Sequence, residues 1–159
     1  RVRDSKQLTP AAREELAAHI REHALAAAVG YVSETVIDRI GIAEAARQAM
    51  LAAVGDLTVR PQHLLIDAFR LPACALGQTA IIGGDGLSLS IACASVVAKV
   101  ARDRVMVGED QNHPGYGFAR NKGYASVEHM RAIRELGPCA LHRRSFSPIR
   151  EMMPALLPV

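Results

Sequence analysis

The sequence has no apolar stretch close to the roughly 20 residues that a membrane-spanning helix requires. Its first residues, RVRDSKQLTP, are too polar for the hydrophobic region of a signal peptide. It contains only three cysteines, Cys74, Cys93 and Cys139, and they form no CxxC pair. Their number and spacing disfavour both a disulfide framework and a zinc site. We therefore expect a cytoplasmic protein with reduced thiols and no membrane partner.

Internal repeats and low-complexity segments are also missing, which favours an ordinary globular domain. At 159 residues, of which 50% are hydrophobic, the chain can bury an adequate core without disulfides or a structural metal. We predict a single domain over residues 1–159, and a monomer. The net charge of +3 is mildly basic, which permits nucleic-acid binding without requiring it.

The first third of the chain has mainly helical patterns. Thr9 and Pro10 suit the start of an amphipathic helix that runs to residue 24. Residues 25–32 are apolar and are consistent with a buried strand, although their alanines would equally suit a helix. Ser33 can cap a short helix to residue 40, and a longer apolar stripe over residues 42–55 predicts another.

Strand and helix patterns alternate in the rest of the chain. We predict strands at residues 64–66 and 79–82, a long helix at 88–107, a loop at 113–123, a helix from Ser126 to Gly137, and a final helical segment that stops at Pro154. Helices that alternate with short strands indicate an α/β layered domain.

Two aspartates follow the two predicted strands. Asp67 ends the apolar run HLLID, and Asp85 lies in the turn IIGGDG. Each carboxylate can therefore be presented at a strand edge, and together they could hold a hard divalent cation. Two carboxylates suggest a metal site but do not complete one.

Basic residues are grouped rather than scattered. The groups are Lys99, Arg102 and Arg104 in the long helix, Arg120 and Lys122 in the glycine-rich loop, and His142, Arg143 and Arg144 near the C-terminus. If the groups converge, they form a phosphate-binding surface. Any one of them taken alone is better explained as a solvated surface.

Several long motifs occur in the order found in one enzyme family. They are DSKQL (residues 4–8), LLID (64–67), GDGLSLSIACASVVAKVARDR (84–104), HPGYGFARNKGYASVEH (113–129) and HRRSF (142–146). On these segments the chain resembles ribonuclease HII. The resemblance implies a ribonuclease-H-like α/β fold, with a mixed sheet flanked by helices and a helical C-terminal part. It also implies cleavage of RNA strands in RNA–DNA hybrids, or cleavage at ribonucleotides embedded in duplex DNA.

The resemblance gives the two aspartates a role. Asp67 matches the family aspartate at the end of a central strand, and Asp85 matches the aspartate of the family's K-G-D motif. In the family both are carboxylates of a Mg²⁺ or Mn²⁺ site that positions the scissile phosphate and an attacking water. The implied products carry a 3′-hydroxyl and a 5′-phosphate.

The resemblance also implies a substrate side. Tyr124 matches a family tyrosine that packs against the sugar at the RNA-to-DNA junction, although a tyrosine that merely covers its loop fits the residue type equally well. Other matches to family positions near the nucleic acid are Lys6, Lys122, His129, Arg143, Arg144 and Ser145. Charged contacts to phosphate are plausible there, and a solvated basic surface is the alternative.

Asp103 lies in a family motif too, but we interpret it as an ion-paired structural carboxylate because Arg102 and Arg104 flank it inside a helix. Two residues depart from the family pattern beside the aspartates: Gly83 stands where the family has Lys, and Ala68 where Gly commonly follows the strand aspartate. The loss of the Lys could raise the affinity for cations or weaken phosphate binding.

A larger departure concerns the family motif D-E-A-G-R-G, which supplies two further metal carboxylates and contacts the ribose 2′-hydroxyl. Nothing in the 159 residues matches it. We therefore expect a sequence truncated in its N-terminal strands. Two hypotheses remain: an endoribonuclease of the ribonuclease HII type, or a non-catalytic relative or fragment that binds hybrid nucleic acid without cutting it.

Overall fold

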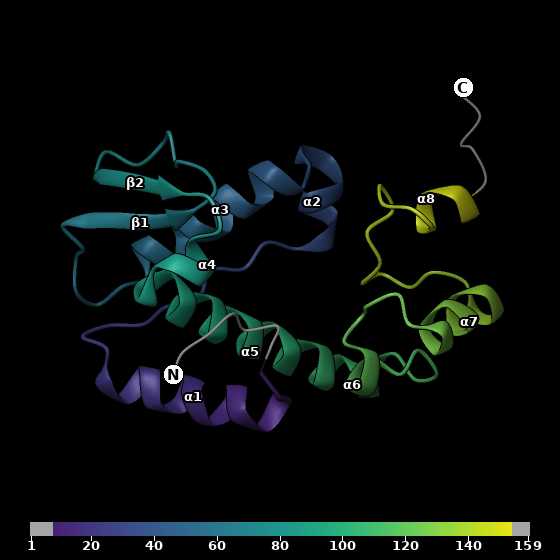
Figure 1. The fold of residues 1–159 in the computed structure, drawn as a ribbon. Coiled ribbons are helices and arrows are strands. Elements are labelled where there is room, and N and C mark those ends of the chain that lie inside the picture. Colours follow the sequence, from purple (N-terminus) through teal and green to yellow (C-terminus); the bar gives the residue numbers. More distant parts are fainter. Residues whose placement is uncertain (1–7, 154–159) are drawn as a thin grey trace. The chain divides into compact units, whose positions relative to one another are not determined.

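The computed structural model describes residues 8–153, which form two compact units (Figure 1). The first, here called the sheet unit, contains the described residues 8–31 and 47–105. The second, here called the helical unit, contains residues 32–46 and 106–153. Each unit has an apolar core of its own. The predicted single domain stays a prediction.

The sheet of the sheet unit has two parallel strands, β1 (His63–Asp67) and β2 (Gly77–Ile81). Side chains along β1 alternate between the two faces, and Leu64 and Ile66 are the buried ones. Both predicted strands are therefore confirmed, and their bounds differ from the prediction by one or two residues. Helix α3 (Ile42–Gly55), predicted from its apolar stripe, covers this core with Met50, Leu51 and Val54.

The loop between the two strands folds around one side chain, that of Gln78. The Leu71 N–H donates to Gln78 Oε1 at 2.8 Å, and Gln78 Nε2 donates to the carbonyls of Leu71 (2.9 Å) and Cys74 (2.8 Å). These bonds satisfy backbone groups that no strand or helix pairs. They hold Leu71, which is 1% exposed, against the sheet.

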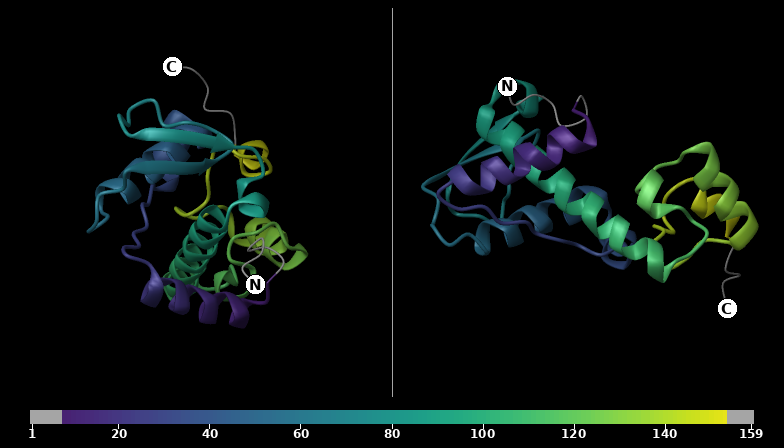
Figure 2. Two further views of the ribbon diagram at one scale, coloured as in Figure 1. Left: turned by 60° about the vertical axis from the view of Figure 1, so that its left-hand side comes forward. Right: turned by 90° about the horizontal axis from the view of Figure 1, so that it is seen from below.

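A second apolar core in the sheet unit joins two helices, α1 (Pro10–His23) and α5 (Leu89–Asn112), which run side by side (Figures 1 and 2). Thr9 caps α1 as predicted, since its Oγ1 accepts from the Ala12 N–H at 3.2 Å. Ala17 and Val96 are fully buried between the helices, where small side chains permit close packing. A short helix, α4 (Gly84–Leu87), precedes α5.

The strand considered for residues 25–32 is wrong: this segment has no regular secondary structure. A Cβ at Gly30 would lie 1.9 Å from the Ala49 carbonyl oxygen of α3, so the backbone passes directly against that helix at this glycine. The segment contacts a helix at Gly30 instead of being paired in a sheet, and none of its residues is fully buried.

The helical unit contains α2 (Glu34–Ile40), α6 (Phe118–Asn121), α7 (Val127–Leu136) and α8 (Ile149–Met152). Ser33 and Ser126 cap α2 and α7 with their side chains, as the sequence predicts. The core of this unit is built from Tyr116, Phe118, Ala132, Ile133 and Ile149.

Two element bounds differ from prediction for identifiable reasons. Helix α5 continues past residue 107 because its hydrogen bonds run on until Pro114, where the His113 N–H still donates to the Glu109 carbonyl at 3.0 Å. The predicted loop at residues 113–123 contains α6, because the buried ring of Phe118 anchors one helical turn there. Pro154, the predicted stop of the last helix, lies outside the described residues. In the part of the chain described, no helix is long and apolar enough to span a membrane.

Candidate active site and nucleic-acid surface

Asp67 is the last residue of β1, where it pairs in register with Ile81 of β2. Its half-buried carboxylate points at the start of α4, since Asp67 Oδ1 accepts a 2.8 Å hydrogen bond from the backbone N–H of Gly84. A helix N-terminus presents unpaired N–H groups, and this bond satisfies one of them. The bond fixes the orientation of the Asp67 side chain from the adjacent loop.

Asp85 follows Gly84 directly and is the second residue of α4. Gly84 is buried so tightly that a Cβ there would lie 2.5 Å from Ile91 Cδ1 and 3.5 Å from Asp67 Oδ1. The α4 backbone therefore lies close against the end of β1, and Ile91 would have to shift if residue 84 carried a Cβ. The Asp85 carboxylate is half-buried, and within residues 8–153 it makes no hydrogen bond or ion pair. The loop thus places both predicted carboxylates at one edge of the sheet.

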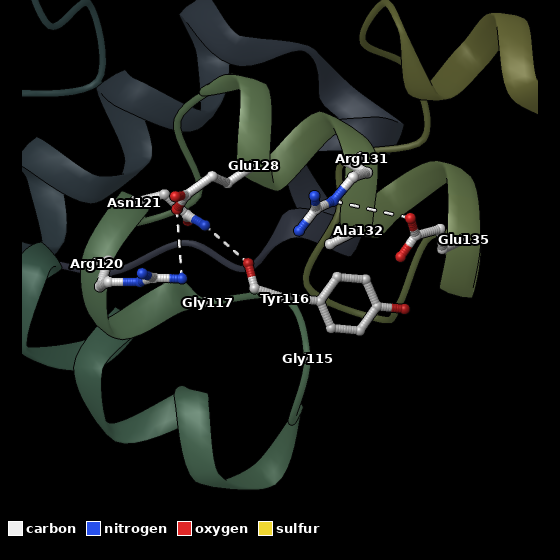
Figure 3. Close-up of a pocket in the computed structure, with 9 residues that line it drawn as sticks. All are labelled: Gly115, Tyr116, Gly117, Arg120, Asn121, Glu128, Arg131, Ala132 and Glu135. Atoms are coloured by element: carbon white, nitrogen blue, oxygen red, sulfur yellow. Dashed lines mark hydrogen bonds and ion pairs between the residues drawn. The ribbon is translucent and has the colours of Figure 1, made fainter.

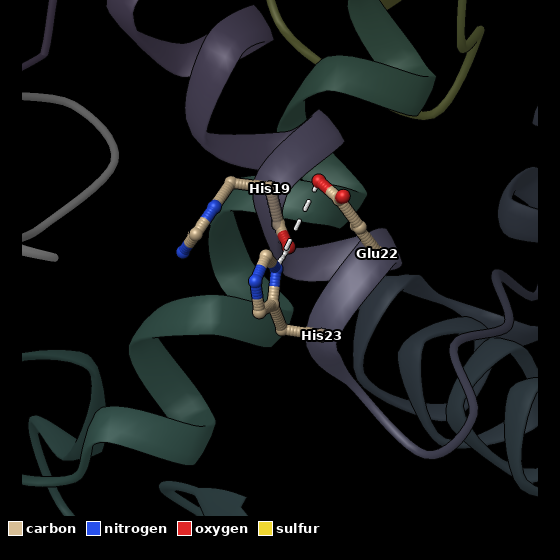
Figure 4. A group of neighbouring side chains, drawn as sticks. All are labelled: His19, Glu22 and His23. Atoms are coloured by element: carbon tan, nitrogen blue, oxygen red, sulfur yellow. Dashed lines mark hydrogen bonds and ion pairs between the residues drawn. The ribbon is translucent and has the colours of Figure 1, made fainter.

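The donor atoms at this edge fit the predicted kind of metal. Asp67 and Asp85 offer only carboxylate oxygens, which suit hard cations such as Mg²⁺ and Mn²⁺. A different group lies on α1, where ligand atoms of His19, Glu22 and His23 all fall within 4.8 Å of one another (Figure 4). Its two imidazoles suit borderline metals such as Zn²⁺ better than Mg²⁺, so it is no substitute for the aspartate pair.

Ala68, immediately after Asp67, adopts a left-handed backbone conformation with φ of 67°. Glycine adopts this conformation without cost, whereas a residue with a Cβ is strained there by about 1–2 kcal/mol. The departure from the family Gly therefore places strain next to the carboxylate. Gly83, at the other departure, has φ of 65°, and nothing lies within 4 Å of where its Cβ would be.

Asp103 lies on α5 and is engaged by cations, as its interpretation as a structural carboxylate predicts. Lys99 Nζ donates to both carboxylate oxygens at 2.6 and 2.7 Å. Arg102 NH1 approaches to 3.5 Å and Arg13 NH2 to 3.9 Å. The Asp103 side chain is only 14% exposed. This carboxylate is neutralised by protein cations, and the prediction of an ion-paired role is confirmed.

The glycine-rich loop of the helical unit is held by the side chain of Asn121. Its Nδ2 donates to the Tyr116 carbonyl at 2.7 Å, and its Oδ1 accepts from the Gly123 N–H at 2.7 Å. These bonds brace the backbone on either side of α6. The next residue, Tyr124, is 56% exposed. The loop thus presents an aromatic ring at the surface, where it could bear on a sugar.

Lys122 closes α6 in a left-handed conformation with φ of 53°. Its ammonium group donates to the carbonyl of Ala119, so the side chain folds back over its own loop. In this arrangement the Lys122 charge lies at the loop surface and also neutralises the end of α6. Its predicted contact with nucleic acid stays a prediction.

A small polar hollow of about 80 Å³ lies beside the same loop (Figure 3). Its residues are Gly115, Tyr116, Gly117, Arg120, Asn121, Glu128, Arg131, Ala132 and Glu135. Two ion pairs cross its walls, Arg120 with Glu128 at 3.3 Å and Arg131 with Glu135 at 3.8 Å. Because each arginine already faces a carboxylate, the hollow has no excess of positive charge for a phosphate.

His129 is buried in the core of the helical unit, at 2% exposure. Its Nδ1 lies 3.1 Å from the Tyr116 carbonyl oxygen, which can only accept, so Nδ1 carries a proton. The ring packs at 5.3 Å from both Phe118 and His142. His129 therefore supports the glycine-rich loop from inside, and its position does not favour the direct phosphate contact that the family match suggests.

His142 is 9% exposed and anchors the C-terminal basic segment to the same core. The Cys139 N–H donates to His142 Nδ1 at 3.0 Å, so the neutral ring carries its proton on Nε2. That Nε2 is buried and has no hydrogen-bond partner among the described residues. Burial, reinforced by the nearby His129, lowers the pKa of His142 below its ordinary value. The imidazole is therefore neutral at pH 7.

Arg143, Arg144 and Ser145 follow His142 and are all exposed. The Arg143 guanidinium stacks over the Phe146 ring at 3.8 Å. The phosphate contacts of Arg143 and Arg144 stay a prediction. Ser145 differs, because its N–H and hydroxyl both donate to Asp38 of α2. Lys6, the remaining predicted contact, lies outside the described residues.

The structure thus groups the predicted residues in two sets, one in each unit. The sheet unit holds Asp67 and Asp85, and the helical unit holds Tyr124, Lys122, His129, Arg143, Arg144 and Ser145. Sequence reasoning missed Asp38, which bonds a segment more than 100 residues away. No local pattern signals that contact; only the HRRSF match pointed to the segment that Asp38 holds.

Comparison with known proteins agrees with the resemblance seen in the motifs. A family model described as Ribonuclease HII matches residues 1–149. A ribonuclease HII of Moorella thermoacetica is 53% identical over 145 residues, which is 91% of this chain and 70% of the relative. A ribonuclease HII of Geobacillus thermodenitrificans is 53% identical over 150 residues, covering 94% of this chain and 58% of the relative.

A further relative, a ribonuclease HII of Syntrophomonas wolfei, is 49% identical over 96% of this chain. The chain spans 60% of its length, so these relatives extend well beyond the matched part. Among solved structures, the ribonuclease H2 from Pyrococcus horikoshii OT3 superimposes with a TM-score of 0.76, over 95% of this chain and 79% of that chain, at 24% identity. This likeness confirms the predicted α/β fold.

Proposed function

Because this chain belongs to the ribonuclease HII family, we propose that it is an endoribonuclease. Its substrates would be RNA strands paired to DNA, or single ribonucleotides embedded in duplex DNA. The observation that carries the proposal is the bond from the Gly84 N–H to Asp67, which ties the end of β1 to the loop that carries Asp85. This bond presents two carboxylates at one sheet edge, as a hydrolytic metal site needs.

Asp67 and Asp85 would hold a Mg²⁺ or Mn²⁺ ion through their oxygens. When bound, such an ion supplies positive charge that stabilises the phosphate during hydrolysis. The chain contributes preorganisation. Asp67 is oriented by the Gly84 N–H, and the buried Gly84 keeps α4 against β1, so little of the arrangement has to form when substrate arrives.

The bond proposed to break is the one between the phosphorus and the 3′-oxygen of the preceding nucleotide. Water would add its oxygen to the phosphorus and its protons would pass to solvent and to the departing 3′-oxygen. The products would then be a 3′-hydroxyl and a 5′-phosphate, as in the family. Charge would build up on the phosphate oxygens, which is the charge that carboxylate-held cations are suited to neutralise.

The helical unit would bind the nucleic acid. Exposed Arg143 and Arg144 would contact phosphates, and the exposed Tyr124 ring would bear on a sugar at the RNA-to-DNA junction. Lys122 and Lys6 stay predicted phosphate neighbours. Ser145 and His129 would support this surface from within and not contact the nucleic acid. The Ser145 hydroxyl already donates to Asp38, and His129 Nδ1 already bonds the Tyr116 carbonyl. A cytoplasmic location and a monomeric state stay predictions.

The second function concerns the 159 residues by themselves, which would bind hybrids without cutting them. These residues contain no D-E-A-G-R-G motif, so by the resemblance they offer two of the four carboxylates that the family uses. Loss of half of a carboxylate set should reduce metal binding and cleavage far more than non-specific phosphate binding. The two functions therefore differ in one measurable property, cleavage.

The test compares the 159-residue chain with the same chain preceded by a segment that carries D-E-A-G-R-G. Both are incubated with three end-labelled substrates, an RNA–DNA hybrid, a DNA duplex with one ribonucleotide, and an all-DNA duplex, in Mg²⁺, Mn²⁺ or chelator. We expect the extended chain to cut both ribonucleotide-containing substrates when metal is present, leaving ends that a polymerase can extend.

The three outcomes separate the hypotheses. Binding of hybrids at low salt without cleavage in any metal supports the non-catalytic relative. Equal cleavage of the all-DNA duplex contradicts ribonucleotide recognition. If the extended chain shows no binding and no cleavage, both functions are ruled out.

A further inference from the structure

The segment that carries Arg143 and Arg144 has no helix or strand to hold it. Residues 137–148 form turns, bends and irregular backbone, so most of their backbone N–H groups depend on partners outside a helix or strand. His142 fixes one end of the segment through its burial in the core of the helical unit. The backbone N–H groups of Arg144 and Ser145, in the exposed part that follows, are both bound by one side chain from α2, that of Asp38.

Asp38 receives three hydrogen bonds from two consecutive residues. The Arg144 N–H donates to Oδ2 at 2.8 Å, the Ser145 N–H donates to Oδ1 at 2.9 Å, and the Ser145 hydroxyl donates to the same Oδ1 at 2.6 Å. Both carboxylate oxygens are thus used. Bonds to an ionised acceptor are stronger than neutral ones, which makes this contact suited to hold a turn at the surface.

The charge state of Asp38 agrees with this geometry. Burial alone would raise its pKa, but the bonds from the Ser145 hydroxyl and from the backbone of Ser145 and Arg144, with the charge of Arg143, outweigh that effect. The pKa of Asp38 is lowered overall. The carboxylate is therefore ionised throughout the range in which nucleic acid binds.

We propose that Asp38 is a positioning residue, which orders the Arg143–Ser145 turn so that the two arginine side chains face the phosphates of the hybrid. This inference rests on the proposed function. The three hydrogen bonds between Asp38 and residues 144 and 145 are here called the Asp38 clamp. The inference reassigns Ser145 from a phosphate contact to part of this clamp, because its N–H and hydroxyl both donate to Asp38. A preordered turn saves the ordering of two long side chains and their backbone on binding.

The sign of the effect separates this role from simple electrostatics. A negative charge beside a phosphate-binding surface should weaken binding, so its removal alone should raise the affinity for nucleic acid. Removal of a positioning residue should lower it. A third possibility is that Asp38 occupies a site that a phosphate would otherwise take. Removal of Asp38 would then also raise the affinity, so a fall in affinity excludes this possibility too.

The test measures binding of the full chain to an RNA–DNA hybrid for Asp38→Asn, in which an amide nitrogen replaces one of the two accepting oxygens. We expect the affinity to fall about threefold to tenfold, as for the cost of ordering one or two side chains. Glu34→Gln is the matched control: it removes one charge from the same helix at a residue that does not bond the turn, and its affinity should be unchanged or slightly higher.

Amide hydrogen exchange gives a readout that is independent of binding. In Asp38→Asn, exchange should accelerate at Arg144 and Ser145 while the amide of Ile133 in α7 keeps its protection. Ser145→Ala, which leaves both backbone bonds in place, should weaken binding less than Asp38→Asn. An unchanged or higher affinity in Asp38→Asn overturns the positioning role. A wild-type chain that does not bind hybrids overturns the proposed function instead, while the exchange result still reports on the clamp.

Discussion

The carboxylate of Asp67 accepts a 2.8 Å hydrogen bond from the backbone N–H of Gly84, the residue directly before Asp85. The bond joins the end of β1 to the first turn of α4, two points 17 residues apart in the chain. Gly84 also packs closely against α5, since a Cβ there would lie 2.5 Å from Ile91 Cδ1. The bond thus holds the loop that carries Asp85 against the end of the strand that carries Asp67.

Ala68→Gly should stabilise the protein. Ala68 has φ of 67°, which strains a residue with a Cβ, so we expect the free energy of unfolding to rise by about 1 kcal/mol. For a chain of this size that corresponds to a rise in Tm of about 2–4 °C. Ala52→Gly in the exposed face of α3 is the control and should lower stability by about 0.5–1 kcal/mol. Thermal unfolding of both variants measures these changes in stability. A lower Tm in Ala68→Gly would contradict the proposed backbone strain at Ala68.

Asp103→Asn should destabilise the protein without any effect on metal binding. The substitution removes the charge that Lys99, Arg102 and Arg13 share, and we expect a loss of about 1–3 kcal/mol. Glu14→Gln, which breaks an exposed pair with Arg104, should cost less than about 1 kcal/mol. Urea unfolding measures both losses. A change in Mn²⁺ affinity in folded Asp103→Asn would instead place Asp103 among the metal ligands.

Arg144→Gln should weaken hybrid binding in a salt-dependent manner. The change removes one phosphate contact but keeps the backbone bond to Asp38, so the negative slope of log affinity against log salt should become shallower by about 1. Binding titrations from low to moderate salt measure this slope. Arg134→Gln removes one positive charge at an exposed position of α7 and should leave the slope unchanged. Equal slopes for wild type and Arg144→Gln would remove this residue from the contact surface.

Stability should decrease as the pH falls below about 6.5, in part because of His142. Its pKa is lowered in the folded protein, so the unfolded chain binds the proton first, and folding is opposed from the unfolded pKa downwards. One such group contributes at most about 1.4 kcal/mol per pH unit. Urea unfolding at pH 7.5 and 5.5 should therefore show a smaller pH effect in His142→Asn than in the wild type. An identical pH effect would mean that His142 does not titrate abnormally.

Much of the fold could be predicted because its signals are local. Thr9, Ser33 and Ser126 each cap the helix that follows, and the flanking arginines predicted that Asp103 is ion-paired, although Lys99 is a partner and Arg104 pairs with Glu14 instead. Residues 25–32 could not be assigned, because no periodic pattern encodes their backbone contact with α3 at Gly30. No sequence pattern predicts the bonds of Asp38 either, since its partners lie 106 and 107 residues further along the chain.

The candidate site was predictable in part for the same reason. The position of Asp67 at a strand end and that of Asp85 shortly after the next strand follow from local patterns, but the hydrogen bond from the Gly84 N–H to Asp67 joins residues 17 apart and no local pattern predicts it. His129 and Ser145 matched family positions near the substrate, but no local pattern predicted the burial of the first or the bonds of the second to Asp38.

The role of the aspartate pair is tested most directly by cleavage of an RNA–DNA hybrid with Asp67→Asn and Asp85→Asn, each in the chain preceded by the D-E-A-G-R-G segment. The proposal predicts that the unsubstituted extended chain cuts in Mg²⁺ or Mn²⁺ and that each substitution abolishes cutting while hybrid binding persists. Normal cutting with both aspartates replaced would contradict the assignment of Asp67 and Asp85 as the metal-binding carboxylates.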